Sequence, residues 1–370
     1  MKNKVLILSS VHRWDDTRIF HKQAKSLAKI YDVELHAIAD FKYKVFEGIN
    51  IYGHKRSFKI FPIRIWFQYL IIALRSESKT VHFHDPDLIF LGVFLRILGK
   101  KVIYDVHEDM PGYIMDKTWI PKIFRKLISI FFDITERATS LFFSEIIVVT
   151  EKVGERFLRK NPAYICNYPS ISNFPRNPHQ NNKSNPFTII YVGVITPRRG
   201  IIEIIQAANF LDKKFNCQIN IIGPIPDANF GKYLKKLILK SPIPFSFKGT
   251  LSYDQAMIEL YNADVGIVCI QPKPYFLESL PNKMFEYMFA GLPVICSNFP
   301  FWKNIIDMNN CGITVNPLNP IEITNAIKYL YSNPEELKIM GMNGRKLVEE
   351  QFNWENEEQK LIKLYNKLTK

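Results

Sequence analysis

The chain has 370 residues, of which 47% are hydrophobic and 23% are charged, and its formal net charge is +14. This balance excludes a disordered or fibrous protein, and the length predicts two globular domains of about 100 to 200 residues each. The five cysteines are scattered and odd in number, which argues against a disulfide framework and against a cysteine-bound zinc site.

Strand-like apolar runs alternate with helical patterns through the first half of the chain. The run at 5–9 has the length of a strand and is followed at once by polar residues, so we interpret it as a buried strand and not as a secretion signal. A helical pattern covers residues 17–30. Further strands are predicted at 33–38, 81–84, 102–106 and 146–150.

Two stretches of the first half, 55–75 and 120–132, mix cations with large apolar side chains. Basic amphipathic helices of this kind can lie in a lipid headgroup layer, but they can equally be core-facing helices with a solvated basic face. No apolar run approaches the roughly 20 residues that span a bilayer. The pattern therefore allows peripheral attachment and excludes insertion.

A linker rich in Pro and Asn is predicted at 173–186, after which the alternation resumes. Strands are expected at 187–192, 218–222, 245–248, 265–270 and 294–297. Two rounds of alternation predict an α/β protein with two doubly wound parallel sheets. Ligands of such open sheets bind beyond the carboxyl ends of the strands, so we expect a cleft where those edges of the two domains meet.

The segment 278–294 joins an acidic loop to a well-delimited helix. Pro281 suits the first helical position, a helix is predicted over 282–290, Gly291 suits a left-handed cap and Pro293 prevents continuation. The free N–H groups of the first turn favour an anion. Lys283 stands in that turn, where a cation is unfavourable unless something negative lies nearby, and this mismatch predicts an anionic ligand.

Glu278 and Glu286, eight positions apart and followed by Ala-Gly-Leu-Pro-Val at 290–294, resemble the signature of the family 4 retaining, nucleotide-sugar-dependent glycosyltransferases. That family has the GT-B fold, in which two Rossmann-like domains face each other across a cleft. The resemblance implies an acceptor-binding domain at 1–172, a donor-binding domain at 173–351 and a C-terminal helix at 352–370 that packs back on the first domain.

The resemblance also implies a donor site. The segment 191–200 resembles the family's Gly-Arg…Lys-Gly segment, with Arg199 in place of the lysine and Val194 in place of the arginine, so one expected cation is absent and Lys283 is a candidate to compensate. Glu286 either binds the nucleotide ribose or pairs with Lys283 on the helix surface. The implied donor-binding residues are Gly193, Arg199, Ser279, Leu280, Pro281, Asn282, Lys283 and Glu286.

Glu278, beside the donor sugar, and His107, at the end of a strand, are the implied catalytic residues. The loop 10–18 lacks the glycine pair of many family members. Its polar residues suit an acceptor hydroxyl, although Asp16 or Thr17 can also serve as a helix cap. Acceptor-side candidates are His12, Asp16, Arg18 and His84. His82 and His84 share a strand face, but we expect no metal there because an Asp85 bonded to its own turn is the simpler account.

Taken together, the residues and the resemblance predict a metal-independent hexosyltransferase that retains anomeric configuration and uses a nucleotide diphosphate sugar without another cofactor. The expected acceptor is a lipid-linked glycan of bacterial surface polysaccharide synthesis, with the protein cytoplasmic or at the inner membrane face. A nucleotide-sugar epimerase of the same fold is the alternative enzyme. A nucleic-acid-binding protein would explain the charge but not the segment 278–294. The oligomeric state is left open.

Overall fold

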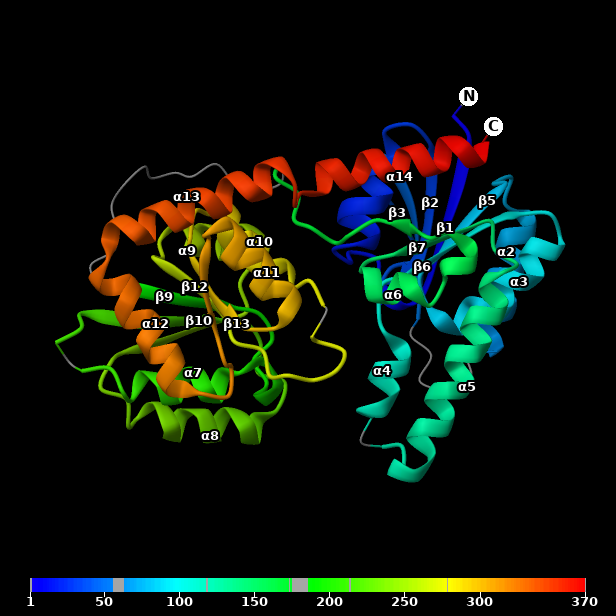
Figure 1. Ribbon diagram of the computed structural model, residues 1–370. Helices are drawn as coiled ribbons and strands as arrows, with labels where there is room; N and C mark the ends of the chain where they lie inside the picture. The colour runs from blue at the N-terminus through cyan, green and yellow to red at the C-terminus, as the bar shows by residue number, and fades with distance from the viewer. Residues whose placement is uncertain are drawn as a thin grey trace. The chain divides into compact units, whose positions relative to one another are not determined.

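The computed structural model describes residues 2–55, 63–117, 119–172, 174, 186–212, 214–277 and 279–369. The chain forms two compact units (Figure 1): unit 1 is Met1–Asn167 with Trp354–Lys370, and unit 2 is Tyr168–Asn353. The divisions fall at 167/168 and 353/354, near the expected positions 172/173 and 351/352. Glu278, residues 56–62 of the first basic stretch and nearly all of the predicted linker lie outside the described residues.

The described part of unit 1 contains an eight-stranded sheet in the order β3-β4-β2-β1-β5-β6-β7-β8. Every neighbouring pair is parallel except β3 and β4, which form an antiparallel hairpin at the edge. The strands are β1 (Lys4–Arg13), β2 (Asp32–Ile38), β3 (Tyr43–Phe46), β4 (Ile49–His54), β5 (Thr80–Phe83), β6 (Lys101–Val106), β7 (Glu145–Val148) and β8 (Ala163–Tyr164).

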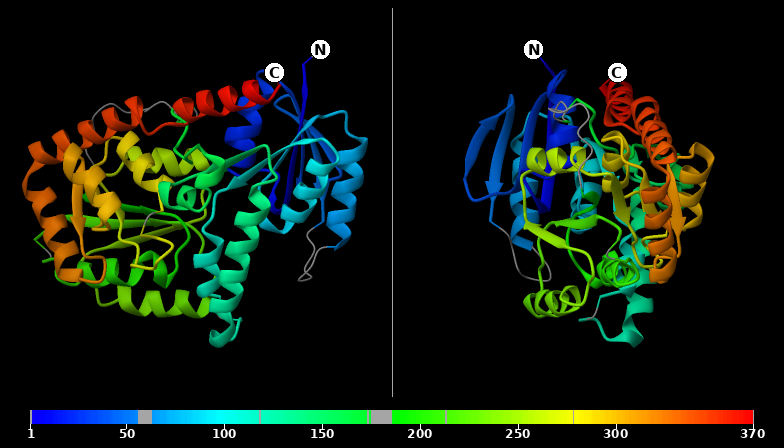
Figure 2. Two further views of the ribbon diagram at one scale, coloured as in Figure 1. Left: turned by 45° about the vertical axis from the view of Figure 1, so that its right-hand side comes forward. Right: turned by 90° about the vertical axis from the view of Figure 1, so that its left-hand side faces the viewer.

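Helices cover both faces of this sheet because successive side chains of a strand point to opposite sides. Val5 and Ile7 of β1 pack toward the C-terminal helix α14, whereas Leu6 and Leu8 pack toward α2 and α3. Figure 2 shows α14 running beside the first strands of unit 1. The helical segments are η1 (Ile19–Ala24), α1 (Lys25–Ala28), α2 (Ile63–Arg75), η2 (Pro86–Leu88), α3 (Ile89–Ile97), α4 (Met110–Met115), α5 (Lys122–Ser140), α6 (Glu151–Glu155), η3 (Leu158–Lys160) and α14 (Trp354–Thr369).

Unit 2 has a fully parallel sheet, six-stranded in the described residues, in the order β11-β10-β9-β12-β13-β14. Its strands are β9 (Phe187–Val192), β10 (Cys217–Ile222), β11 (Phe245–Gly249), β12 (Val265–Val268), β13 (Val294–Ser297) and β14 (Gly312–Val315). Its helices are η4 (Pro197–Arg199), α7 (Ile201–Ala208), α8 (Ala228–Ile238), α9 (Tyr253–Tyr261), α10 (Asn282–Phe289), α11 (Pro300–Asn309), α12 (Pro320–Ser332) and α13 (Pro334–Glu350).

Most of the predicted strands are present within a few residues of their expected ends. The β3–β4 hairpin was not predicted, because its first strand has only four residues, all of them exposed, and the short strands β8 and β14 were not predicted either. The helix predicted at 17–30 is two pieces, the π-helical η1 followed by α1. Pro281 is not the first helical residue as expected: its backbone is extended, with ψ at 119°, so α10 begins at Asn282.

Candidate active site

The backbone has an unusual conformation at Gly193, directly after the carboxyl end of β9. Its φ is 140°, a region that side chains rarely allow, and its N–H donates to the carbonyl of Ile222 at the end of β10. The neighbouring Val192 N–H donates to the hydroxyl of Tyr287 at 2.7 Å. Helix α10 is thereby fixed against the end of the central strand.

Lys283, in the first turn of α10, fills the space that a side chain at Gly193 would need. Its Nζ lies 2.6 Å from the position of a Cβ on Gly193 and 4.4 Å from the centre of the Tyr191 ring. Burial and, to a smaller extent, the charge of Arg199 lower the pKa of Lys283 to about 7, while Glu286 opposes the shift. A lysine this close to losing its proton gains from any anion that binds beside it.

Arg199 contributes a second cation to the same end of the sheet. It closes the short helix η4 after β9, and its guanidinium carbon lies 5.0 Å from the centre of the Phe276 ring. The aromatic face holds the side chain half-buried while leaving its N–H groups available for charge-assisted hydrogen bonds. Val194, which stands in place of the family's arginine, is exposed, and its carbonyl accepts a hydrogen bond from the Tyr191 hydroxyl.

The N-terminus of α10 completes this group. Within the described residues no side chain caps the helix, and Asn282 is half-buried at its first position. Ser279 and Leu280 lead into the helix, with the Ser279 carbonyl accepting from the indole of Trp302 at 2.6 Å. Glu286 lies one turn further on and is partly accessible. The predicted donor-binding residues thus come from one end of the unit 2 sheet, whereas the predicted catalytic residue Glu278 lies outside the described residues.

In unit 1 a histidine and a buried aspartate form the central pair at the carboxyl edge of the sheet. His12 Nδ1 lies 2.8 Å from Asp85 Oδ1, and Asp85 Oδ2 accepts from the Ser9 hydroxyl and the Ser10 N–H at 2.7 Å each. Burial would raise the pKa of Asp85, but the bonds from His12 and Ser9 outweigh it and hold the pKa at about 2. Burial would lower the pKa of His12, but Asp85 raises it to about 9. The pair is therefore ionised at neutral pH.

A second buried pair lies beneath the first. Arg18 donates to both carboxylate oxygens of Asp105 at 2.9 Å, and Gln23 donates to Asp105 at 2.5 Å. His84 Nδ1 lies 3.5 Å from Asp105. Burial works against the Asp105 charge, yet Arg18 and His84 hold its pKa well below the usual range. Arg18 and His84, predicted on the acceptor side, are buried members of this network in the structure.

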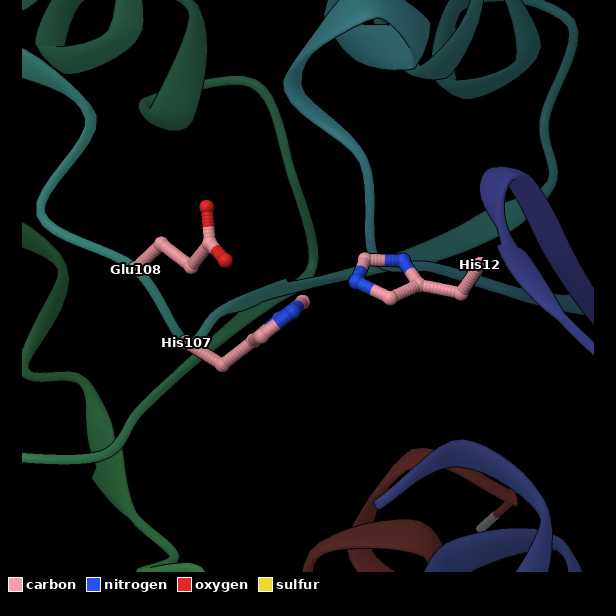
Figure 3. Close-up of side chains that lie close together, drawn as sticks. All are labelled: His12, His107 and Glu108. Atoms are coloured by element: carbon pink, nitrogen blue, oxygen red, sulfur yellow. The ribbon is translucent and has the colours of Figure 1, made fainter. Parts of the chain in front are cut away.

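His107 follows β6 directly, as predicted, and stands next to His12 (Figure 3). The two ring centres are 5.1 Å apart, and His107 Nδ1 lies 3.3 Å from the Asp105 carbonyl. Burial lowers the pKa of His107, and the nearby charge of Arg18 lowers it further. His107 is thus set toward the neutral form beside a charged His12, and the exposed Glu108 adjoins both.

Asp16 has a structural role at the start of η1. Its Oδ1 accepts from the N–H groups of Arg18 and Ile19 at 2.8 and 2.9 Å, which is the capping alternative considered for this loop. The expectation that Asp85 bonds to its own turn is wrong, because its carboxylate binds Ser9, Ser10 and His12 instead. Asp105 and Glu108 were not predicted as site residues. The signal for all three is their position directly at the ends of β5 and β6, where parallel sheets present functional groups.

Two groups of described residues could hold a metal ion: His12, His107 and Glu108, and the buried His82, His84 and Asp105. In the second group the guanidinium of Arg18 already binds the carboxylate, which leaves little for a cation to gain. In the first group His12 carries the proton that a metal would have to displace.

Comparison with known proteins gives this geometry a context. Residues 173–347, which lie almost entirely in unit 2, match the family described as glycosyl transferases group 1. Unit 2 is a group 1 glycosyltransferase domain. The whole chain is 23% identical over 353 residues to an uncharacterized glycosyltransferase of Methanocaldococcus jannaschii, covering 92% of this chain and 87% of the relative.

Solved structures resemble the chain along its whole length. The crystal structure of Anabaena HepE in complex with UDP matches with a TM-score of 0.73 at 14% identity, covering 99% of this chain and 100% of that one. The structure of WaaG, a glycosyltransferase involved in lipopolysaccharide biosynthesis, matches with a TM-score of 0.70 at 15% identity, covering 97% and 98%. The predicted GT-B fold is confirmed, and the predicted glycosyltransferase family is confirmed for residues 173–347.

Proposed function

We propose that this glycosyltransferase moves a hexose from a nucleotide diphosphate sugar to an acceptor hydroxyl with retention of anomeric configuration. The observation that carries the proposal is the half-buried Lys283, with its pKa lowered to about 7, at the start of an uncapped helix and coupled to Arg199. Burial and the neighbouring charge of Arg199 make the ammonium form of Lys283 costly in the free protein. A bound diphosphate removes that cost.

The same groups stabilise the leaving group during transfer. As the bond from the sugar to the phosphate breaks, negative charge grows on the diphosphate, and Arg199, Lys283 and the first N–H groups of α10 are preorganised to receive it. Each donor of this kind typically lowers the barrier to transfer by about 3 to 4 kcal/mol. The similarity to HepE, whose structure holds UDP, supports a nucleotide diphosphate as the ligand.

The acceptor is assigned to the residues of unit 1. The imidazolium of His12 is held by Asp85 through Nδ1, which leaves Nε2 for an acceptor oxygen, and the neutral His107 beside it can accept a hydrogen bond. His107 and Glu278 remain the proposed catalytic residues. Glu286 is proposed to bind the nucleotide ribose.

Transfer is proposed to need no protein-bound metal. Lys283 and Arg199 supply the positive charge that a divalent cation would otherwise bring to the diphosphate, and no described acidic cluster stands beside them. The expected result is full activity after dialysis against a chelator. A loss of activity that added Mg²⁺ or Mn²⁺ restores would contradict this part.

A lipid-linked glycan is proposed as the acceptor, in the synthesis of a bacterial surface polysaccharide at the inner membrane face. The basic, aromatic first half of the chain and the similarity to WaaG support this class. No helix in the described ranges has both the length and the apolar character needed to cross a bilayer.

The test is a thermal-shift screen of UDP and GDP sugars with the wild type and the Arg199→Ala, Lys283→Met and Glu286→Ala variants. Stabilisation by one nucleotide class, lost in the variants, is expected; a shift that persists in all three would refute the donor site. NMR of the product's anomeric centre then decides retention. A nucleotide-sugar epimerase would release its free product without an acceptor, so product formation in the absence of an acceptor distinguishes this alternative.

A further inference from the structure

Helix α5 turns one row of polar side chains inward. Residues Ser129, Asp133, Glu136 and Ser140 follow one another at helical spacing on the face toward unit 1, and Ser129, Glu136 and Ser140 are buried. Arg156 from beyond α6 binds both Asp133 and Glu136, and the Tyr104 hydroxyl donates to Glu136 at 2.6 Å. We call these contacts of Asp133 and Glu136 the polar seat of α5. They fix which side of α5 faces the rest of unit 1.

The apolar side chains of α5 therefore point away from the unit. Ile123, Leu127 and Phe131 are 76%, 63% and 73% exposed, and Ile130 and Ile134 continue the same stripe. A core-facing helix would show the opposite arrangement, with its apolar stripe buried. The structure therefore contradicts, for α5, the alternative of a core-facing helix with a solvated basic face.

The two neighbouring helices repeat the pattern. Phe67, Ile71 and Leu74 of α2 and Phe90, Phe94 and Ile97 of α3 are exposed, although other faces of both helices pack into the core through Tyr69 and Leu91. Helix α3 contacts both α2 and α5, and Figures 1 and 2 show the three helices on one side of the sheet of unit 1. We call the outward apolar side chains of these three helices the α2–α3–α5 face.

The charges on these helices have one sign toward solvent. Helices α2 and α3 contain no acidic residue, and the two acidic residues of α5 are turned inward to Arg156. Exposed cations flank the apolar stripes: Arg64, Arg75, Arg96, Lys122 and Lys126. Exposed apolar stripes flanked by these cations are suited to an anionic headgroup layer, where each cation contributes about 1 kcal/mol.

We propose that the α2–α3–α5 face docks on an anionic lipid bilayer, with its apolar side chains in the acyl boundary and its cations at the phosphates. This inference deepens the proposed function, because a lipid-linked acceptor must be reached at that surface. A second copy of the chain is the competing occupant. A twofold contact would set like charges of the two copies against each other, which disfavours it.

The experiment measures sedimentation of the full chain with vesicles of phosphatidylcholine alone and of an equimolar mixture with phosphatidylglycerol. Strong binding is expected only to the mixed vesicles. The Leu127→Glu/Phe131→Glu variant should lose at least about tenfold in affinity, since two outward apolar groups no longer enter the lipid. The Lys122→Gln/Lys126→Gln variant should lose about tenfold or more and make the remaining binding less salt-dependent.

Matched controls are Leu239→Glu and Met308→Glu, which change equally exposed apolar residues of unit 2, 85% and 76% exposed, and should bind as the wild type does. Equal binding to both vesicle types, or undiminished binding of the α5 variants, would overturn the proposal. So would a vesicle-free dimer that the α5 variants abolish in analytical ultracentrifugation. Stabilisation by a nucleotide sugar is measured on the same variants, so a failed donor site and a failed docking face give separate results.

Discussion

The ammonium of Lys283 lies 2.6 Å from the point where a Cβ on Gly193 would sit, so the glycine at the end of β9 makes room for the cation at the start of α10. The two residues are 90 positions apart in the sequence, and the Tyr287 hydroxyl bonded to the Val192 N–H keeps them in register. The donor end of unit 2 depends on this spacing.

The Gly193→Ala variant should displace Lys283 and weaken binding of UDP-glucose, or of the nucleotide sugar that the screen identifies, by at least about tenfold. The added methyl group also strains a φ of 140°, at about 1 to 3 kcal/mol of folding free energy. Isothermal titration calorimetry measures the affinity. Gly249→Ala is the control, because its φ is also positive at 66° but nothing lies within 4 Å of its Cβ position. If the Gly193→Ala and Gly249→Ala variants bind the nucleotide sugar with equal affinity, the space beside Gly193 does not matter for binding.

Binding of a nucleotide diphosphate sugar should weaken as the pH rises from about 6 to about 8. Burial lowers the pKa of Lys283 to about 7, so the free protein loses the ammonium across this window, whereas a bound diphosphate favours the charged form and raises the pKa. Above pH 7 the dissociation constant should increase up to about tenfold per pH unit. Calorimetry in buffers of different ionisation heat should detect proton uptake on binding.

Two variants test the origin of this pH dependence. Lys283→Met should bind weakly at every pH, and Lys283→Arg, which stays charged, should bind with little change between pH 6 and pH 8. If the wild-type affinity is flat over this range, or if the methionine variant keeps the wild-type slope, Lys283 is not the group that meets the diphosphate.

The His12–Asp85 pair should stabilise unit 1 most between about pH 4 and pH 6.5. The pKa of His12 is raised to about 9, so its contribution to the free energy of unfolding is complete below the ordinary histidine pKa and is lost as the pH rises through 9. The pKa of Asp85 is lowered to about 2, so its contribution is lost only as the pH falls through 2. Asp85→Asn should cost about 3 kcal/mol in the free energy of unfolding at pH 5.5 and less at pH 9. Urea unfolding at the two pH values measures both, and an equal cost at both would reject the ionised pair.

Much of the fold could be predicted because its strands are buried on both sides and read as continuous apolar runs, as in β9 and β12. The α10 segment was predictable for a local reason: Pro281, Gly291 and Pro293 fix its ends within a few residues. Even so, Pro281 lies just before the helix, because an extended ψ is also compatible with proline.

The unit 1 network was not predictable in the same way. His12 meets Asp85 over 73 positions and Arg18 meets Asp105 over 87, and such pairings follow from the strand order, which hydrophobic periodicity does not encode. The direction of α5 was equally hidden. A helical period shows that a helix has two different faces, but only the distant partner Arg156 determines that the polar face is the inner one.

Arg156 should accordingly be essential for seating α5. Its removal in Arg156→Met leaves Glu136 buried at the sheet, where burial already raises the carboxyl pKa, and leaves Asp133 without its inner partner. We expect a loss of about 3 to 5 kcal/mol in the free energy of unfolding. Arg345→Met, which removes an exposed helical pair with Glu349, should cost under about 1 kcal/mol. Chemical denaturation compares the two, and hydrogen exchange should show faster opening of α5 in the first variant alone. Equal stability of the two variants would mean that apolar contacts, not the polar seat, hold α5 in its outward-facing orientation.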